Sequence, residues 1–256
     1  MRAIVLTSDG LRHTYFAETV ASHFDLLGMI KERKGNYYTT EQDASVLIKA
    51  HFEALRNVER AWFGEACWPR APALDLSKGR INDADTIAWA ADLRPDLIFL
   101  FGTSILNKEW LAQFPQKIIN LHLGMSPYYR GSATLFWPIA NDELECVGAT
   151  IHLAEQHVDA GRILAWAKPT LCVGDDYYTI NYKTIRQAIN AMADVAIRYA
   201  RGEIEPMVQD LRLGKVYRKA DFNEDVLSRA LSAIGNGLTV QQLDNIRTSK
   251  KCDCSS

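Results

Sequence analysis

Long apolar runs are missing from the sequence: no stretch reaches the roughly 18 apolar residues that a membrane-spanning helix needs. The apolar run at residues 3–7 is too short for a signal peptide. Internal repeats and low-complexity segments are lacking too. We therefore expect a soluble cytoplasmic protein that has no membrane partner.

An excess of charge of one sign is also missing. The 256 residues include 29 Lys and Arg and 31 Asp and Glu, which gives a formal net charge of −2. Because proteins that grip a phosphate backbone normally present a cationic surface, we expect no nucleic-acid partner. The 48% hydrophobic content suffices for a globular core and excludes a disordered chain or a fibre.

Cysteine is scarce and odd in number. The five positions are Cys67, Cys146, Cys172, Cys252 and Cys254. Since a chain of this size folds without disulfides, we expect reduced thiols in a cytoplasm. No second cysteine pair or histidine cluster accompanies Cys252 and Cys254, so we predict no metal site.

Short apolar runs alternate with helical patterns over the first 122 residues. The runs at 3–7, 26–30, 97–101 and 118–122 are typical of buried parallel strands. Helical spacing is found between them, in the stripe Phe16, Val20, Phe24 and Leu27 and in Asp43 to Phe63, Ala84 to Leu93 and Leu106 to Phe114. This order predicts an α/β, Rossmann-like fold with a mostly parallel sheet.

The pattern changes after residue 146. Extended runs at 147–153 and 163–171 predict antiparallel strands at the far side of the sheet. Thr184 to Arg201 predicts a helix that Gly202 ends, and Glu224 to Ile234 predicts another before a polar tail. We divide the chain into a core at 1–202 and a short C-terminal extension at 203–256.

Three polar residues are candidates for chemistry. Asn120 and His122 point to one face at the end of a predicted buried strand, where open α/β sheets bind ligands. Asp159 lies in a predicted turn. Each of them, taken alone, is compatible with a structural role satisfied by local hydrogen bonds. Together, an amide, an imidazole and a carboxylate can stabilise an oxyanion and move a proton, as acyl transfer to an amine requires.

Four blocks carry a family resemblance. They are Asn120-x-His122, Ser126-Pro127-x-x-Arg130-Gly131, the sequence VGATIH at 147–152, and Asp159-x-Gly161. In this order and spacing the blocks resemble the folate-dependent formyltransferases. That family includes glycinamide ribonucleotide transformylase, methionyl-tRNA formyltransferase and the sugar N-formyltransferases. The resemblance covers roughly residues 1–175 and implies the formyltransferase fold.

The resemblance implies 10-formyltetrahydrofolate as co-substrate and no metal. It assigns Asn120 to the developing oxyanion and makes His122, in its protonated form, the partner of Asp159, whose carboxylate is expected to raise the pKa of the imidazole. His152 is expected to have a structural role. Folate contacts, mostly through the backbone, are expected from Ser104, Ile105, Leu106, Ala154, Glu155, His157 and Val158.

Departures from the family's better-known members narrow the acceptor. The loop after the first strand has one glycine, Gly10, beside Asp9, which is unsuited to a ribotide phosphate. The C-terminal part is too short for the tRNA enzyme's barrel. The similarity to sugar N-formyltransferases implies a nucleotide-linked 4-amino-4,6-dideoxy sugar, GDP-perosamine or a dTDP-amino sugar, of O-antigen or other polysaccharide biosynthesis. Acceptor contacts are expected from Tyr128, Tyr129, Arg130 and Trp137.

Two other functions stay open. One is formylation of another small amine, of the hydroxyornithine or glycinamide ribonucleotide type. The other is a folate-binding or nucleotide-binding module without catalysis. The role of residues 203–256 also stays open among packing on the core, pairing two subunits as a homodimer and closing over the nucleotide.

Overall fold

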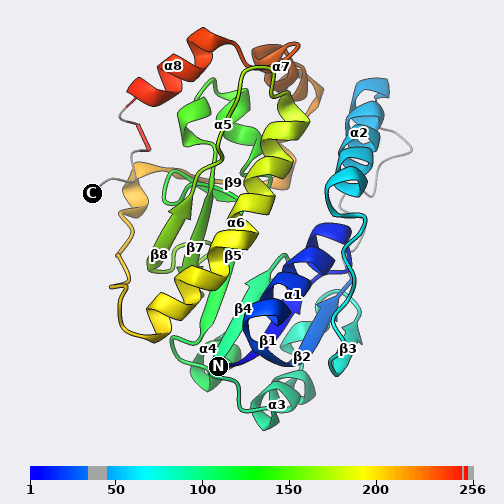
Figure 1. Cartoon of the computed structure of the whole chain (residues 1–256), viewed down its shortest axis with the longest axis vertical. Helices are drawn as coiled ribbons and strands as arrows, with labels where there is room; N and C mark the ends of the chain where they lie inside the picture. Colours follow the sequence, from blue (N-terminus) through cyan, green and yellow to red (C-terminus); the bar gives the residue numbers. More distant parts are fainter. Residues whose placement is uncertain (34–44, 250, 253–256) are drawn as a thin grey trace.

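The computed structural model describes residues 1–33, 45–249 and 251–252 (Figure 1). Its main sheet has seven strands in the order β3-β2-β1-β4-β5-β7-β8. Their bounds are β1 Arg2–Thr7, β2 Asp25–Glu32, β3 Ala73–Leu76, β4 Leu97–Phe101, β5 Ile118–His122, β7 Ala149–Leu153 and β8 Ile163–Ala167. The strands from β3 to β5 are parallel, and β7 and β8 join as antiparallel strands beyond β5. The predicted Rossmann-like α/β fold is confirmed.

Helices cover both faces of this sheet because its central strands are apolar on both sides. In β1 and β4, Val5 and Phe99 belong to one core cluster, whereas their neighbours Ile4 and Ile98 belong to another. The first cluster includes residues of α1 and α6, and the second includes residues of α3 and α4. The bounds are α1 Leu11–His23, α2 Val46–Phe63, α3 Ala84–Asp92, α4 Lys108–Gln113, α5 Phe136–Ala140 and α6 Tyr177–Ala200.

Two elements differ from the sequence prediction. Helix α6 begins at Tyr177 rather than Thr184 because the side chain of Asp176 caps it, accepting a bond from Thr179 N at 2.7 Å. Strand β3 lies where no strand was predicted, and pairing with β2 holds it there. The predicted helix start at Asp43 lies outside the described residues.

The C-terminal extension folds back on the core. Its strand β9, Lys215–Tyr217, pairs in parallel with the short strand β6, Tyr129–Gly131. Helix α7, Glu224–Ile234, packs on α5, and α8, Val240–Thr248, contacts the turn at 144–146. Within the described residues, no helix is long and apolar enough to cross a membrane.

A disulfide joins Cys146 to Cys252, so the expectation of reduced thiols is wrong for this pair. The two cysteines are 106 residues apart in sequence and meet only because the extension returns to the core. Cys67 and Cys172 are free and exposed, and Cys254 lies outside the described residues. The described part of the chain contains no cluster of three or more His, Cys, Asp or Glu side chains that could hold a metal.

Candidate active site

Strand β5 lies between β4 and β7 in the sheet. Its residues Asn120 and His122 are two positions apart, so their side chains point to the same face of the sheet. Asp159 reaches this point from the turn between β7 and β8, in a left-handed conformation with φ of 50°. Gly161 closes the turn, and a Cβ atom there would lie 1.7 Å from the carbonyl oxygen of Leu153. The Asp-x-Gly pattern thus reflects a turn that needs a residue without a side chain at its end.

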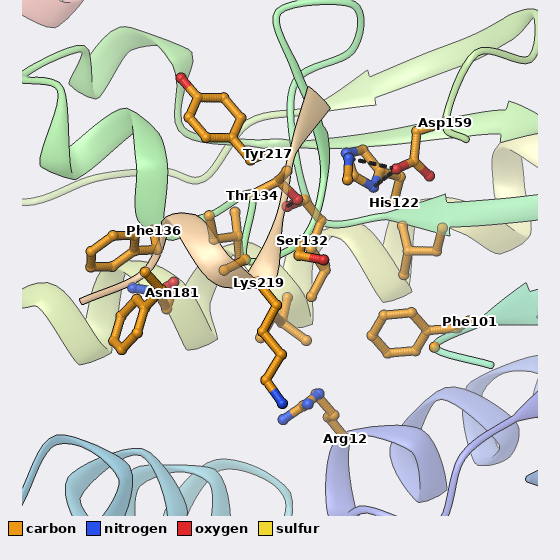
Figure 2. Close-up of a pocket in the computed structure, with 18 of the residues that line it drawn as sticks. Arg12, Phe101, His122, Ser132, Thr134, Phe136, Asp159, Asn181, Tyr217 and Lys219 are labelled. Carbon is orange, nitrogen blue, oxygen red and sulfur yellow. Dashed lines mark hydrogen bonds and ion pairs between the residues drawn. The ribbon is translucent and has the colours of Figure 1, made fainter. Parts of the chain in front are cut away.

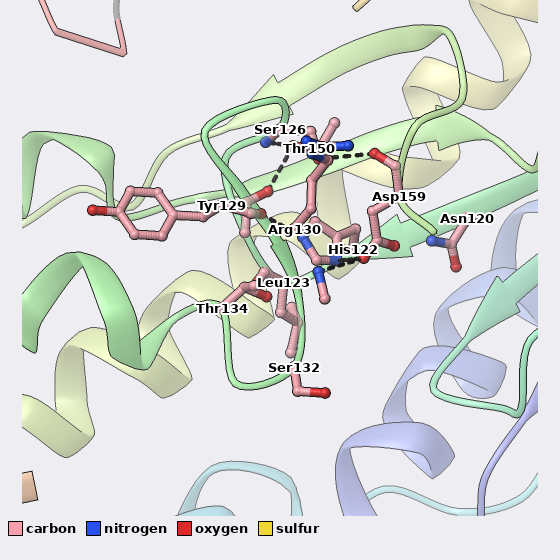
Figure 3. Close-up of polar contacts among 12 residues, drawn as sticks. Asn120, His122, Leu123, Ser126, Tyr129, Arg130, Ser132, Thr134, Thr150 and Asp159 are labelled. Carbon is pink, nitrogen blue, oxygen red and sulfur yellow. Dashed lines mark hydrogen bonds and ion pairs between the residues drawn. The ribbon is translucent and has the colours of Figure 1, made fainter. Parts of the chain in front are cut away.

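His122 is buried between two acceptors (Figure 3). Its Nδ1 lies 3.2 Å from Asp159 Oδ2, and its Nε2 lies 2.8 Å from the carbonyl oxygen of Tyr129. The backbone N–H of Gly131 donates to the same carboxylate oxygen at 2.9 Å. Carbonyl and carboxylate oxygens only accept, so these contacts are satisfied together only when both ring nitrogens carry protons.

Burial of His122 opposes the positive charge of a doubly protonated ring. It lowers the pKa of His122 below its ordinary value, and the attraction of Asp159 offsets only part of the effect. The expected net rise in the pKa of His122 is therefore wrong. Burial raises the pKa of Asp159, but His122, His152 and the Gly131 N–H together lower it to about 2. Burial thus disfavours the imidazolium that the two acceptors favour, while the carboxylate of Asp159 is kept ionised by its neighbours.

The amide of Asn120 is oriented by His152. Its Nδ2 lies 3.0 Å from His152 Nε2, while His152 Nδ1 lies 2.8 Å from the carbonyl oxygen of Leu153. Since that carbonyl can only accept a hydrogen bond, Nδ1 carries the imidazole proton and Nε2 accepts from the amide. One amide hydrogen is thereby used, and the other is available to a developing negative charge. The predicted structural role of His152 includes holding this amide.

Two cavities meet at Asn120 and Asp159, which line both of them. The larger, of about 940 Å³, is also lined by His122 and is seen in Figure 2. The smaller, of about 120 Å³, is also lined by His152. An oxyanion donor and a proton-transfer pair at such a junction can act on two molecules, one in each cavity.

A known family matches this chain. The pattern of the formyl transferase family covers residues 45–196. The chain belongs to this family.

Solved structures with this fold include several formyltransferases. A sugar N-formyltransferase from a Shewanella species is 15% identical with a TM-score of 0.58, over 93% of this chain and 90% of that one. A phosphoribosylglycinamide formyltransferase from Anaplasma phagocytophilum is 18% identical with a TM-score of 0.56, over 80% and 89%. The formyltransferase PseJ from Anoxybacillus kamchatkensis, solved with a UDP-linked formamido sugar and tetrahydrofolate, is 17% identical with a TM-score of 0.52, over 94% and 97%. At these identities the likeness shows a shared fold.

The smaller cavity of this formyl transferase brings together every residue predicted for folate. They are Ser104, Ile105, Leu106, Ala154, Glu155, His157 and Val158. Sequence reasoning missed Glu32, at the end of β2, although a carboxylate in an apolar strand was the available signal. Glu32 is buried and accepts bonds from the backbone N–H of Gly79 at 2.8 Å and of Ser104 at 2.6 Å. It therefore fixes the backbone of the loop after β4.

The residues predicted for the acceptor line neither cavity. Tyr129 and Trp137 are buried and stack on Tyr217, with ring centroids 5.5 and 4.6 Å apart. Arg130 is also buried, and its guanidinium donates to the backbone carbonyls of Pro127 and Leu211. Tyr128 is half-buried and is likewise absent from the lining of both cavities. Their placement follows from the pairing of β6 with β9, which turns this stretch toward the C-terminal extension.

Other elements build the larger cavity. Its cationic side chains are Arg12 of α1, Arg56 of α2, and Arg218 and Lys219 of the C-terminal extension. Figure 2 shows Arg12 and Lys219 pointing toward the same space. The carboxylates in the lining are Glu59, which pairs with Arg12 at 3.0 Å, and Asp159. Among the described residues, cations outnumber carboxylates around this space, an electrostatic setting that favours an anionic ligand.

Proposed function

We propose that the chain transfers the formyl group of 10-formyltetrahydrofolate to the amine of a nucleotide-linked 4-amino-4,6-dideoxy sugar. GDP-perosamine and dTDP-linked amino sugars are the leading acceptors, for O-antigen or related polysaccharide biosynthesis in the cytoplasm. The observation that carries the proposal is the position of Asn120 and Asp159 where the two cavities meet. The folate would enter the smaller cavity and the sugar nucleotide the larger one.

The reaction needs a carbon–nitrogen bond to form at the amine and another to break at N10 of the folate. The free N–H of Asn120 would donate to the formyl oxygen as negative charge develops there. His122 would share that charge in its protonated form, while Asp159 takes the proton that the amine loses. That proton returns to N10 through the imidazole or water, so the folate leaves as tetrahydrofolate and no metal takes part.

The cationic lining supports a nucleotide-linked acceptor. A diphosphate carries negative charges that Arg12, Arg56 and Lys219 can bind, with the sugar amine directed toward Asp159. The structures of relatives point the same way: PseJ was solved with a UDP-linked sugar, and a Helicobacter canadensis N-formyltransferase with dTDP-3-aminofucose.

The test is transfer by the purified protein. We expect tetrahydrofolate release from 10-formyltetrahydrofolate with one member of a panel of GDP-, dTDP- and UDP-linked 4-amino sugars, and a formamido sugar as the second product. The panel includes hydroxyornithine and glycinamide ribonucleotide as alternative amines. If tetrahydrofolate is released only with one of these amines, that amine is the acceptor and the proposed sugar nucleotide is not. If the protein binds folate but releases no tetrahydrofolate with any amine, it is a folate-binding module without catalysis.

A further inference from the structure

A segment of the C-terminal extension lies against the turn that carries Asp159. Met207 pairs with Ile163, with two backbone hydrogen bonds of 2.8 Å, and so holds the segment beside the start of β8. Gln209 follows at the turn itself. These residues come after position 196, where the match to the family ends. The sequence left the role of the extension open, and these contacts indicate a role in supporting the Asp159 turn.

Gln209 donates both of its amide hydrogens to the Asp159 turn. Its side-chain nitrogen lies 3.0 Å from the carbonyl oxygen of Asp159 and 2.5 Å from that of Gly161. Because both partners are acceptors, the orientation of the amide is determined. The side chain bridges the two ends of a three-residue turn whose first residue has φ of 50°.

The oxygen of the same amide lowers the stability of the fold. Gln209 Oε1 is buried and has no hydrogen-bond partner among the described residues. A buried unpaired oxygen destabilises a fold, and an apolar side chain of this length would avoid the cost. An amide at this position is therefore best explained by what its two N–H groups do for the turn. Ser126, whose Oγ lies 3.4 Å from the Asp159 carbonyl oxygen, is the only other described side chain that donates to it.

A second part of the C-terminal extension supports the partners of the carboxylate. Strand β9 pairs with β6, which supplies the Tyr129 carbonyl beside His122 and the Gly131 N–H beside Asp159. The approach at Gly131 is close: a Cβ there would lie 2.3 Å from the carbonyl oxygen of Tyr217. The extension thus contacts both the turn that bears Asp159 and the strand that faces it.

We propose that Gln209 is a positioning residue for formyl transfer: it holds the Asp159 turn so that the carboxylate stays in contact with His122 and the Gly131 N–H. This inference rests on the proposed function for its kinetic consequence. Its structural consequence, the contact between Asp159 and His122, is independent of the acceptor. When that contact loosens, His122 loses the attraction that opposes the effect of burial.

The experiment replaces Gln209 by Met in the full-length protein, which keeps the length of the side chain and removes both donors. The matched control is Gln242→Met, because Gln242 lies in the same extension and its amide also donates to a backbone carbonyl, that of Ala233. Transfer kinetics and the pH titration of the His122 ring, followed by NMR and assigned with His122→Gln, are measured for both. The other ionisable groups facing this ring, His152 and Arg130, are unchanged in both variants.

For Gln209→Met we expect kcat to fall by about tenfold to a hundredfold, with both KM values within about threefold of the parent, as for a misplaced catalytic group. The His122 titration should move to lower pH, whereas Gln242→Met should match the parent in both measurements. A parental kcat, a parental His122 titration, or a loss confined to KM would overturn the proposal. If Gln209→Met does not fold, Gln209→Asn, whose shorter amide cannot span both carbonyls, is judged by the same criteria. If the parent transfers no formyl group, the proposed function fails and the titration alone decides this inference.

Discussion

The two cavities that meet at Asn120 and Asp159 are built in different ways. Apart from Asn120, the smaller cavity is lined by the end of β4 with the loop that follows it and by the end of β7 with the loop that follows it, two short segments whose residues are nearly continuous in sequence. The larger draws its lining from α1, α2, α5, α6 and the C-terminal extension, which are scattered over the chain (Figures 1 and 2). Sequence reasoning named most of the lining of the first cavity, but of the second it named only Asn120, His122, Asp159 and Val158.

The physical reason is that the two cavities are assembled by different parts of the fold. Loops at the carboxyl ends of adjacent strands are brought together by the sheet itself, and they can bind a ligand through backbone groups. A cavity between helices and a returning extension depends on how distant side chains pack. The first is therefore expected to tolerate changes of side chain better than the second.

The junction between the cavities should show the largest effect. Asn120→Ala removes the proposed oxyanion donor, which typically costs about a hundredfold to a thousandfold in rate. We expect kcat to fall by that factor with folate affinity unchanged, measured by steady-state kinetics and by calorimetric titration of folate. The control is Asn245→Ala, on an exposed position of α8. If Asn120→Ala loses folate binding together with turnover, the loss of rate is explained by folate binding and Asn120 is not shown to be an oxyanion donor.

Asp159 should also affect stability, in a pH-dependent way. Its pKa falls from 3.8 to about 2 on folding, so its contribution is complete above its unfolded pKa and is lost as the pH falls through 2. We expect Asp159→Asn to lower the free energy of unfolding by about 2 kcal/mol at pH 6, from roughly 1.4 kcal/mol per pKa unit.

Urea unfolding at pH 6 and at pH 3 measures this difference, which should narrow at the lower pH. The exposed Asp244→Asn serves as the reference. An Asp159→Asn difference that is the same at both pH values would show that the carboxylate is not held in the ionised form by its neighbours.

The larger cavity should respond to a change of charge at its rim. Lys219→Gln removes one cation from the proposed diphosphate site, and a hydrogen bond to a charged group is worth about 1.5–3 kcal/mol. Because Lys219 is exposed, we expect the lower end of that range, an increase in acceptor KM of about tenfold, with folate KM unchanged. Lys78→Gln, on an exposed loop, is the control. Equal changes in both KM values would contradict the division of substrates between the cavities.

The smaller cavity should give the smallest response to a side-chain change. Ser104→Ala is expected to leave folate affinity within about twofold, because the described contact of this residue with Glu32 uses its backbone N–H. Glu32→Gln, which turns an amide N–H toward one of those backbone donors, should weaken folate binding by about threefold to tenfold. Calorimetric titration with folate measures the folate affinity of both variants. A large loss for Ser104→Ala would show recognition by the side chain.

Several features followed from the sequence because they depend on local order. The alternation of apolar runs with helical stripes predicted β1, β2, β4 and β5 and the helices between them, and the structure confirms these elements. The change of pattern after residue 146 predicted the antiparallel strands β7 and β8, which are confirmed. The membership of the formyl transferase family, inferred from four motifs, is confirmed too.

Other features depended on residues that are distant in sequence. Nothing in the spacing of Cys146 and Cys252 indicates that the extension brings them together. The aromatic pattern near Tyr129 does not reveal that β9 would cover it, and a glutamine at position 209 has no motif of its own.

The sequence by itself determined six of the seven strands of the main sheet, the family and the residues at the strand ends, because periodicity and turn chemistry act over a few residues. Only the tertiary structure decided three further points: the net pKa of His122, the lining of the larger cavity and the contact of the extension with the Asp159 turn. Each of these is set by burial or by contacts between segments far apart in the chain. Such quantities have no local signature, because they arise only when the packed chain excludes water and brings distant groups together.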